Sequence, residues 1–147
     1  MTLVSRTSLD PIVHEYALPC SVDEAFDVYV RCIGEWWDPA YTASPSTFAG
    51  VTIEPRVGGR IYATFTDRDH DEWGTVNVWE PPHRLVHTFT LAQRADAPSE
   101  VNVRFSQSGS GSAMRFQHGG WEEANASYRE KFSDWRLILD RYAALVR

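Results

Sequence analysis

The sequence predicts an α+β protein in which a curved antiparallel sheet of six to seven strands surrounds a long C-terminal helix. Between residues 51 and 118, short segments rich in β-branched and aromatic residues alternate with turns rich in Gly, Pro, Ser and Asp. The last segment, 122–146, contains no Gly or Pro and repeats apolar residues every three or four positions. Because strands that coil around one helix leave space where their curvature exceeds the helix radius, we expect a pocket between sheet and helix.

A strand, two short helices and a loop precede this series of strands. Ser21 and Glu24 have the spacing of a capping box, which predicts the start of the first helix. Pro19 ends the strand before it, and Pro39 ends the second helix because the residue before a proline disfavours helical geometry. We expect the strand, the two helices and the loop at residues 12–18, 22–31, 32–37 and 40–50.

Short connections join the later strands, so neighbouring strands should pair antiparallel. Alternating apolar residues assign one face of 101–105 and one face of 114–118 to the core, with His118 as the polar exception. In the same way, His87 shares a face with Leu85 and Phe89. We expect these strands at residues 51–55, 59–65, 72–79, 84–91, 100–106 and 112–118.

Length and charge limit the class of protein. The 147 residues suffice for one domain, which we expect to span 1–147 with residues 1–10 as an N-terminal tail. The chain has 14 Lys and Arg against 20 Asp and Glu, a formal charge of -6, and no basic cluster, which disfavours a nucleic-acid partner. No apolar run approaches the roughly 20 residues that span a bilayer, and the first residues lack the apolar centre of a signal peptide. We therefore expect no membrane span and a cytoplasmic location.

Aromatic residues make up 13% of the chain and include six Trp, more than a small core usually requires. They should line either a bulky core or a cavity for a small apolar or aromatic molecule. Adjacent Trp36 and Trp37 could plug one end of the core, form a wall of the pocket, or do both. We expect the ligand-binding walls at Trp36, Trp37, Tyr62, Trp73, His87, Phe89, Met114, Phe116, His118, Tyr128, Phe132 and Trp135.

His87 and His118 lie on otherwise apolar strand faces, which leaves two interpretations open. Each is either a hydrogen-bonded core residue or a polar group that orients a ligand. If the two meet with Tyr62 or Tyr128, acid–base chemistry becomes available. The sequence does not establish that they meet, so it assigns no catalytic residue.

Other catalytic and metal-binding patterns are absent from the sequence. The five His residues lack the compact spacing of zinc ligands, and Cys20 and Cys32 form no paired motif, so we expect no metal. There is no Gly-x-Ser-x-Gly elbow and no phosphate-binding loop, and we expect no cofactor. Asp67, Asp69 and Asp71 alternate as calcium ligands do, but the Gly and distal Glu of a calcium loop are missing, which favours a solvated hairpin tip.

The order of these elements resembles the START-like superfamily, also called helix-grip or SRPBCC. Within it, the chain is most similar to the family named for the C-terminal domain of the activator of the Hsp90 ATPase homologue. The resemblance covers residues 11–146 and implies the helix-grip fold and a ligand-holding cavity. The residues that carry it lie at 21–26, 36–39, 57–59, 73–76, 80–86, 118–121, Trp135 and Leu139.

Three functions remain open. The first is binding or carriage of a small apolar or aromatic molecule between sheet and helix. The second is a cofactor-free enzyme of the cyclase, aromatase or hydrolase kind, in which His87, His118 or Tyr62 moves a proton. The third is a chaperone-associated stress-response module, which only the family name suggests. An exposed edge strand or tryptophan cluster would favour a homodimer.

Overall fold

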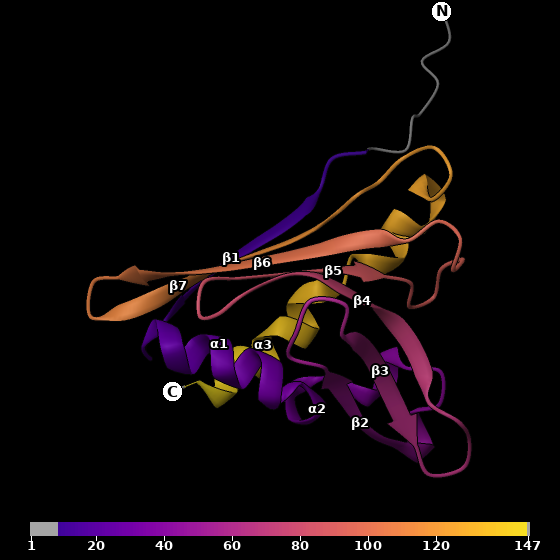
Figure 1. The fold of residues 1–147 in the computed structure, drawn as a ribbon, viewed down its shortest axis with the longest axis horizontal. Helices are drawn as coiled ribbons and strands as arrows, with labels where there is room; N and C mark the ends of the chain where they lie inside the picture. Colours follow the sequence, from indigo (N-terminus) through magenta and orange to yellow (C-terminus); the bar gives the residue numbers. More distant parts are fainter. Residues whose placement is uncertain (1–8, 147) are drawn as a thin grey trace, which may run out of the picture.

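A curved antiparallel sheet of seven strands dominates the computed structural model, which describes residues 9–146 (Figure 1). The strands lie in the order β1-β7-β6-β5-β4-β3-β2, so consecutive strands from β2 to β7 are neighbours and β1 pairs with β7. This confirms the expected α+β class and the expected sheet. The strands are β1 (Ile12–Leu18), β2 (Phe48–Ile53), β3 (Arg60–Phe65), β4 (Asp71–Glu80), β5 (Arg84–Phe89), β6 (Ser99–Ser108) and β7 (Gly111–Gly119).

The helices pack against one face of this sheet, with α1 and α3 lying on the same side (Figure 1). Ser21 caps the first helix as predicted, because the backbone N–H of Glu24 donates to Ser21 Oγ at 3.1 Å. The Tyr142 hydroxyl donates to the carbonyl of Ala25 at 2.7 Å and thereby joins α3 to α1. The helical elements are α1 (Val22–Arg31), α2 (Ile33–Trp36), α3 (Trp135–Leu145) and the 3₁₀ turns η1 (Pro39–Tyr41), η2 (Pro45–Thr47) and η3 (Ala126–Phe132).

The C-terminal helical segment differs from the expectation in its winding. Asn125 fixes a turn, because its side-chain oxygen accepts from the N–H of Glu122 and its amide nitrogen donates to the carbonyls of Ala97, Pro98 and Gly120. The chain after this turn winds as the 3₁₀ element η3, and regular α-helix covers only Trp135–Leu145. An apolar repeat of three or four residues fits both windings, so the sequence pattern could not separate them.

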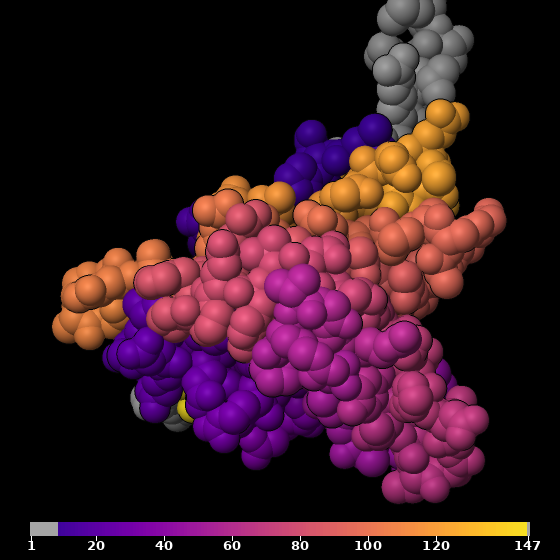
Figure 2. Space-filling model, in the orientation of Figure 1, coloured from indigo at the N-terminus to yellow at the C-terminus, as the bar shows by residue number. Residues whose placement is uncertain are grey.

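The sheet bends where β4 meets its neighbours. Register shifts interrupt the β3–β4 pairing and the β4–β5 pairing. Gly74 lies in this region, and a Cβ on it would be 1.8 Å from the carbonyl oxygen of Thr88, so only glycine allows the two strands to approach this closely. Figure 2 shows the β3–β4 hairpin projecting at one end of the molecule and the β6–β7 hairpin at the other.

The inner face of the sheet carries the core. Cross-strand partners share a face, and the register places His87, Val101 and His118 in one row across β5, β6 and β7. All three are buried, as are Leu139 and other apolar residues of α3 that pack against this face. Within residues 9–146, none of the helices has the length and apolar character needed to cross a membrane.

Candidate ligand-binding cavity

A cavity of about 310 Å³ lies between β5 and the helical segment formed by η3 and α3. Five of its thirteen lining residues are aromatic, and most of the others are apolar or are polar residues at the border of the cavity. The residues that line it are Trp37, Tyr41, Thr42, Ala43, Asp71, Phe89, Leu91, Ala92, Lys131, Phe132, Asp134, Trp135 and Ile138.

Phe89 stands at the centre of the aromatic wall. Its ring centroid lies 5.8 Å from that of Phe132, 5.7 Å from that of Trp135 and 6.4 Å from that of Trp37. Phe132 and Trp135 stack at 6.2 Å with an interplanar angle of 21°. Phe132 ends η3 and Trp135 begins α3, so the stack lies at the junction of the two elements.

Polar groups at the border of the cavity are tied to one another and to the walls. The Tyr41 hydroxyl donates to Asp134 Oδ2 at 3.0 Å, and the pKa of Tyr41 is raised chiefly by this hydrogen bond to a carboxylate. Trp37 Nε1 donates to the carbonyl of Tyr41 at 3.2 Å. Lys131 Nζ donates to the carbonyl of Ala92 at 3.3 Å. These contacts connect η1, the segment after β5, and the start of α3 around one opening.

His118 is held by partners on both ring nitrogens. An indole N–H can only donate, so the 3.0 Å contact from Trp135 Nε1 to Nδ1 means that Nδ1 is unprotonated. Nε2 then carries the proton and donates to Ser99 Oγ at 2.6 Å. Burial, with smaller contributions from the charges of His87 and Arg129, lowers the pKa of His118 to about 3. His118 is therefore a neutral, fully engaged group behind the Trp135 wall.

His87 is buried in the same row but has a free acceptor. Its Nδ1 lies 2.7 Å from the carbonyl oxygen of Thr88, which can only accept, so Nδ1 carries the proton. Among residues 9–146, no group donates to the remaining Nε2 lone pair. Burial lowers the pKa of His87 to about 4. Val101 of β6 lies between the two histidines in the register, and within the described chain no hydrogen bond joins their rings.

The residues predicted to form the walls divide into groups in the structure. Four line the cavity itself: Trp37, Phe89, Phe132 and Trp135. Six are buried elsewhere in the core: Trp36, Trp73, His87, Met114, Phe116 and His118.

The two predicted tyrosines lie apart from the histidines. The Tyr62 ring contacts His70 beside the β3–β4 turn, with centroids 5.1 Å apart. The Tyr128 ring packs under Lys131 Nζ at 4.8 Å. No contact joins either tyrosine to His87 or His118 in the described part of the chain, so their assignment to ligand binding stays a prediction.

Sequence reasoning missed most of the polar border. Tyr41, Thr42 and Ala43 follow the second helix in a segment that predicts only a loop, and no periodicity marks them. Lys131 and Asp134 looked like ordinary solvent-facing residues of an amphipathic helix. Ile138 could have been found, since it lies three residues after Trp135 on the apolar stripe. Between residues 9 and 146 there is no cluster of three His, Cys, Asp or Glu side chains that could hold a metal ion.

A curved sheet that grips a C-terminal helix over an apolar cavity defines a START-like, SRPBCC-type protein. Within this superfamily, the chain belongs to the family described as activator of Hsp90 ATPase homolog 1-like protein, whose model matches residues 21–147. The comparison with curated proteins found no match.

Solved structures show the same fold over nearly the whole chain. Protein MLL2253 from Mesorhizobium loti is 18% identical, with a TM-score of 0.68 over 92% of this chain and 95% of its own. The anthrahydroquino-γ-pyrone synthase Txn09 is 25% identical, with a TM-score of 0.63 over 97% of this chain and 100% of its own. The Aha1 dimer from Colwellia psychrerythraea is 13% identical, with a TM-score of 0.66 over 92% of this chain and 95% of its own.

Proposed function

We propose that this protein binds a small apolar or aromatic molecule in the cavity between β5 and the η3–α3 segment. The observation that carries this proposal is the wall of aromatic rings around a space of about 310 Å³, within the range of small-molecule sites. The indole N–H groups of Trp37 and Trp135 already have protein partners, so these rings offer apolar surface to a ligand. Stacking and dispersion contacts would then supply most of the affinity.

The test is to titrate an apolar and aromatic compound library while following tryptophan fluorescence and the melting temperature. A ligand in contact with Trp37 and Trp135 should quench emission and raise the melting temperature as its concentration increases. Native mass spectrometry of the purified protein would identify a molecule retained from the cell.

A matched pair of variants locates the binding. Ile138 lines the cavity and is 5% exposed, whereas its neighbour Leu137 is 56% exposed on the other side of α3. Ile138→Trp should fill the cavity and abolish quenching, and Leu137→Trp should leave it intact. If Ile138→Trp does not fold, Ala43→Trp is the alternative, because its side chain would block the cavity from the exposed border. Binding that survives both cavity variants would disprove this location.

A second candidate is a cyclase-type reaction on an aromatic substrate. The likeness to the anthrahydroquino-γ-pyrone synthase Txn09, at 25% identity over both chains, favours it. His87 does not line the cavity, so its free Nε2 could accept a hydrogen bond from a substrate hydroxyl only if the substrate displaced part of the wall. A pKa near 4 makes this nitrogen a weak general base at neutral pH, which ranks binding above catalysis. Turnover of a phenolic anthrahydroquinone that His87→Gln abolishes would support the reaction, and an unchanged substrate would exclude it.

A homodimer and a cytoplasmic location also belong to the proposal. The sheet ends in two edge strands, β1 and β2, and one of the similar structures is described as an Aha1 dimer. Cys20 and Cys32 are free thiols, as is usual for proteins of a reducing compartment. Light scattering over a range of protein concentrations would detect the dimer.

A further inference from the structure

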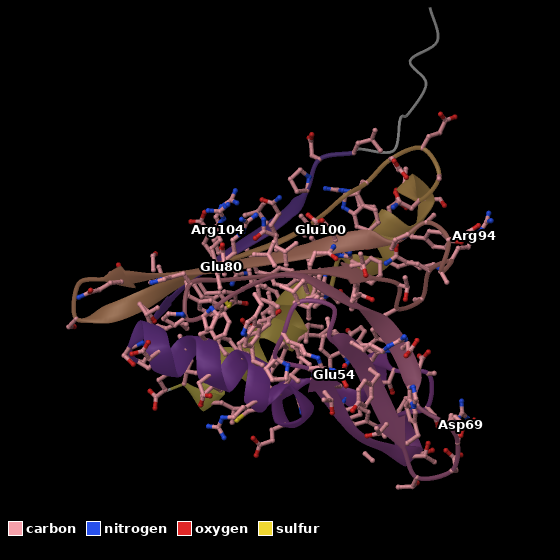
Figure 3. All side chains as sticks on the ribbon, in the orientation of Figure 1. Glu54, Asp69, Glu80, Arg94, Glu100 and Arg104 are labelled. Carbon is pink, nitrogen blue, oxygen red and sulfur yellow. The ribbon has the colours of Figure 1, made fainter. Side chains whose placement is uncertain are left out.

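A second group of side chains lies on the face of the sheet that the helices leave uncovered. The register of β6 and β7 pairs Asn102 with Gln117 and Arg104 with Arg115, and β5 places Arg84 opposite Arg104. Their sequence neighbours point into the core, so these five side chains project outward. Figure 3 shows Arg104 on the side of the sheet away from the helices.

Four of these residues, Asn102, Arg104, Arg115 and Gln117, surround a hollow of about 420 Å³, named here the arginine hollow. The hollow is polar, unlike the cavity beside α3. It lies on the opposite face of the sheet, so a ligand there would not compete with a ligand in the apolar cavity.

The hydrogen bonds around the arginine hollow leave several donors free. Arg115 Nη1 donates to Gln117 Oε1 at 2.8 Å, and Arg84 Nε lies 3.5 Å from Asn102 Oδ1. Because a guanidinium group can only donate, both amide oxygens must face the arginines and both amide NH₂ groups are left available. The side chain of Arg104 makes no hydrogen bond or ion pair with any residue of the described chain. The hollow thus presents N–H donors and positive charge, and among the described residues the one carboxylate at ion-pair distance from its four side chains is that of Glu15, beside Arg115.

The charges around the arginine hollow limit the size of an anion that could bind there. Three arginines on adjacent strands repel one another, which is unfavourable unless an anion offsets them. Carboxylates bound the row at both ends, since Arg115 Nε lies 3.5 Å from Glu15 Oε1 and Glu80 pairs with Arg84 across β4 and β5. Glu100 precedes Asn102 by two residues on β6 and faces the same way. A long polyanion would run over these carboxylates, whereas a compact anion fits between them.

We propose that the arginine hollow binds a compact anion that carries phosphate or carboxylate oxygens. The planar fork of a guanidinium group matches the paired oxygens of either group, and the free amide donors add further hydrogen bonds. The affinity should weaken with salt, because the side chains are exposed and their charge is screened.

The test is calorimetric titration of the protein with pyrophosphate and, separately, with citrate, at constant low ionic strength. We expect saturable binding of at least one anion, and Arg104→Gln should weaken it by about tenfold or more through loss of a charge-assisted hydrogen bond. Arg115→Lys keeps the charge but loses the fork, so it should also weaken binding. Arg68→Gln is the matched control, because it removes the same charge from the exposed β3–β4 turn, beside Asp67.

The outcomes separate clearly. Tighter binding of pyrophosphate assigns the hollow to phosphate, and tighter binding of citrate assigns it to carboxylate. If neither anion binds saturably, or if Arg68→Gln weakens binding as much as Arg104→Gln, the proposal is wrong. A circular dichroism spectrum and melting curve for each variant establish that the fold is retained.

Discussion

His118 is held by residues that are far apart in the sequence. Trp135 on α3 donates to one ring nitrogen, and Ser99 at the start of β6 accepts from the other. Gln93 donates to Ser99 Oγ at 2.9 Å and extends the network to the segment after β5. A buried network of this kind fixes the position of the Trp135 ring and with it one wall of the cavity.

The two buried histidines should make the fold sensitive to acid. Burial lowers the pKa of His118 to about 3 and of His87 to about 4, whereas both titrate near 6.5 in the unfolded chain. Between these values the unfolded chain binds protons that the folded protein does not, so the free energy of unfolding falls as the pH drops below about 6.5 and is unaffected above it. At about pH 5, each histidine should lower the free energy of unfolding by about 2 kcal/mol.

Urea unfolding at about pH 7.5, 6 and 5 measures this effect. His118→Phe should reduce the dependence on pH, and the exposed His70→Gln should leave it unchanged. Equal stability at all three pH values would contradict the assignment of both histidines as neutral in the folded protein.

At the scale of elements, the bend in β4 depends on one glycine. Gly74→Ala would place a methyl group 1.8 Å from the Thr88 carbonyl oxygen, so β4 and β5 must separate. We expect a loss of at least about 2 kcal/mol in the free energy of unfolding. Gly50→Ala in β2 is the control, because its nearest contact would be at 3.6 Å, and it should change stability by less than about 1 kcal/mol. If chemical denaturation showed similar losses of free energy of unfolding for both variants, the close approach of β4 to β5 at Gly74 would not be what requires glycine there.

The border of the cavity depends on a contact between η1 and the start of α3. Tyr41→Phe removes the hydrogen bond to Asp134 and should speed amide hydrogen exchange in residues 38–47. Tyr16→Phe removes a comparable phenol–carboxylate bond to Asp140, away from the cavity, and should leave that segment unchanged. Unaltered hydrogen exchange in Tyr41→Phe would mean that other contacts hold η1 against the start of α3.

At the scale of the whole molecule, stability depends on the contact between α3 and the inner face of the sheet. Leu139 is fully buried there, and Leu137 on the same helix is 56% exposed. Leu139→Ala should lower the free energy of unfolding by about 2 to 5 kcal/mol, because it removes buried methyl groups and leaves a void. Leu137→Ala should stay within about 0.5 kcal/mol of the parent protein in the same urea titration. Equal effects would mean that α3 is not the principal support of the core.

The sequence determined the order of the elements, the strand faces and the first helix cap, because these follow from local periods and from spacings within a few residues. It also indicated Trp37, Phe89, Phe132 and Trp135 as part of an aromatic pocket. It could not indicate that Tyr41, Asp134 and Lys131 border the cavity, since loop and helix-surface residues carry no periodic signal.

Only the tertiary structure decided how these parts meet. The winding of the C-terminal segment, the tautomer of His118 and the arginine hollow each depend on contacts between residues that are distant along the chain. Trp135 and His118 are 17 positions apart, and Arg84 and Asn102 are 18 apart. Local pattern fixes which side of a strand or helix a residue occupies. The distances between elements are set by packing and register, and those distances determine what the cavity and the hollow can bind.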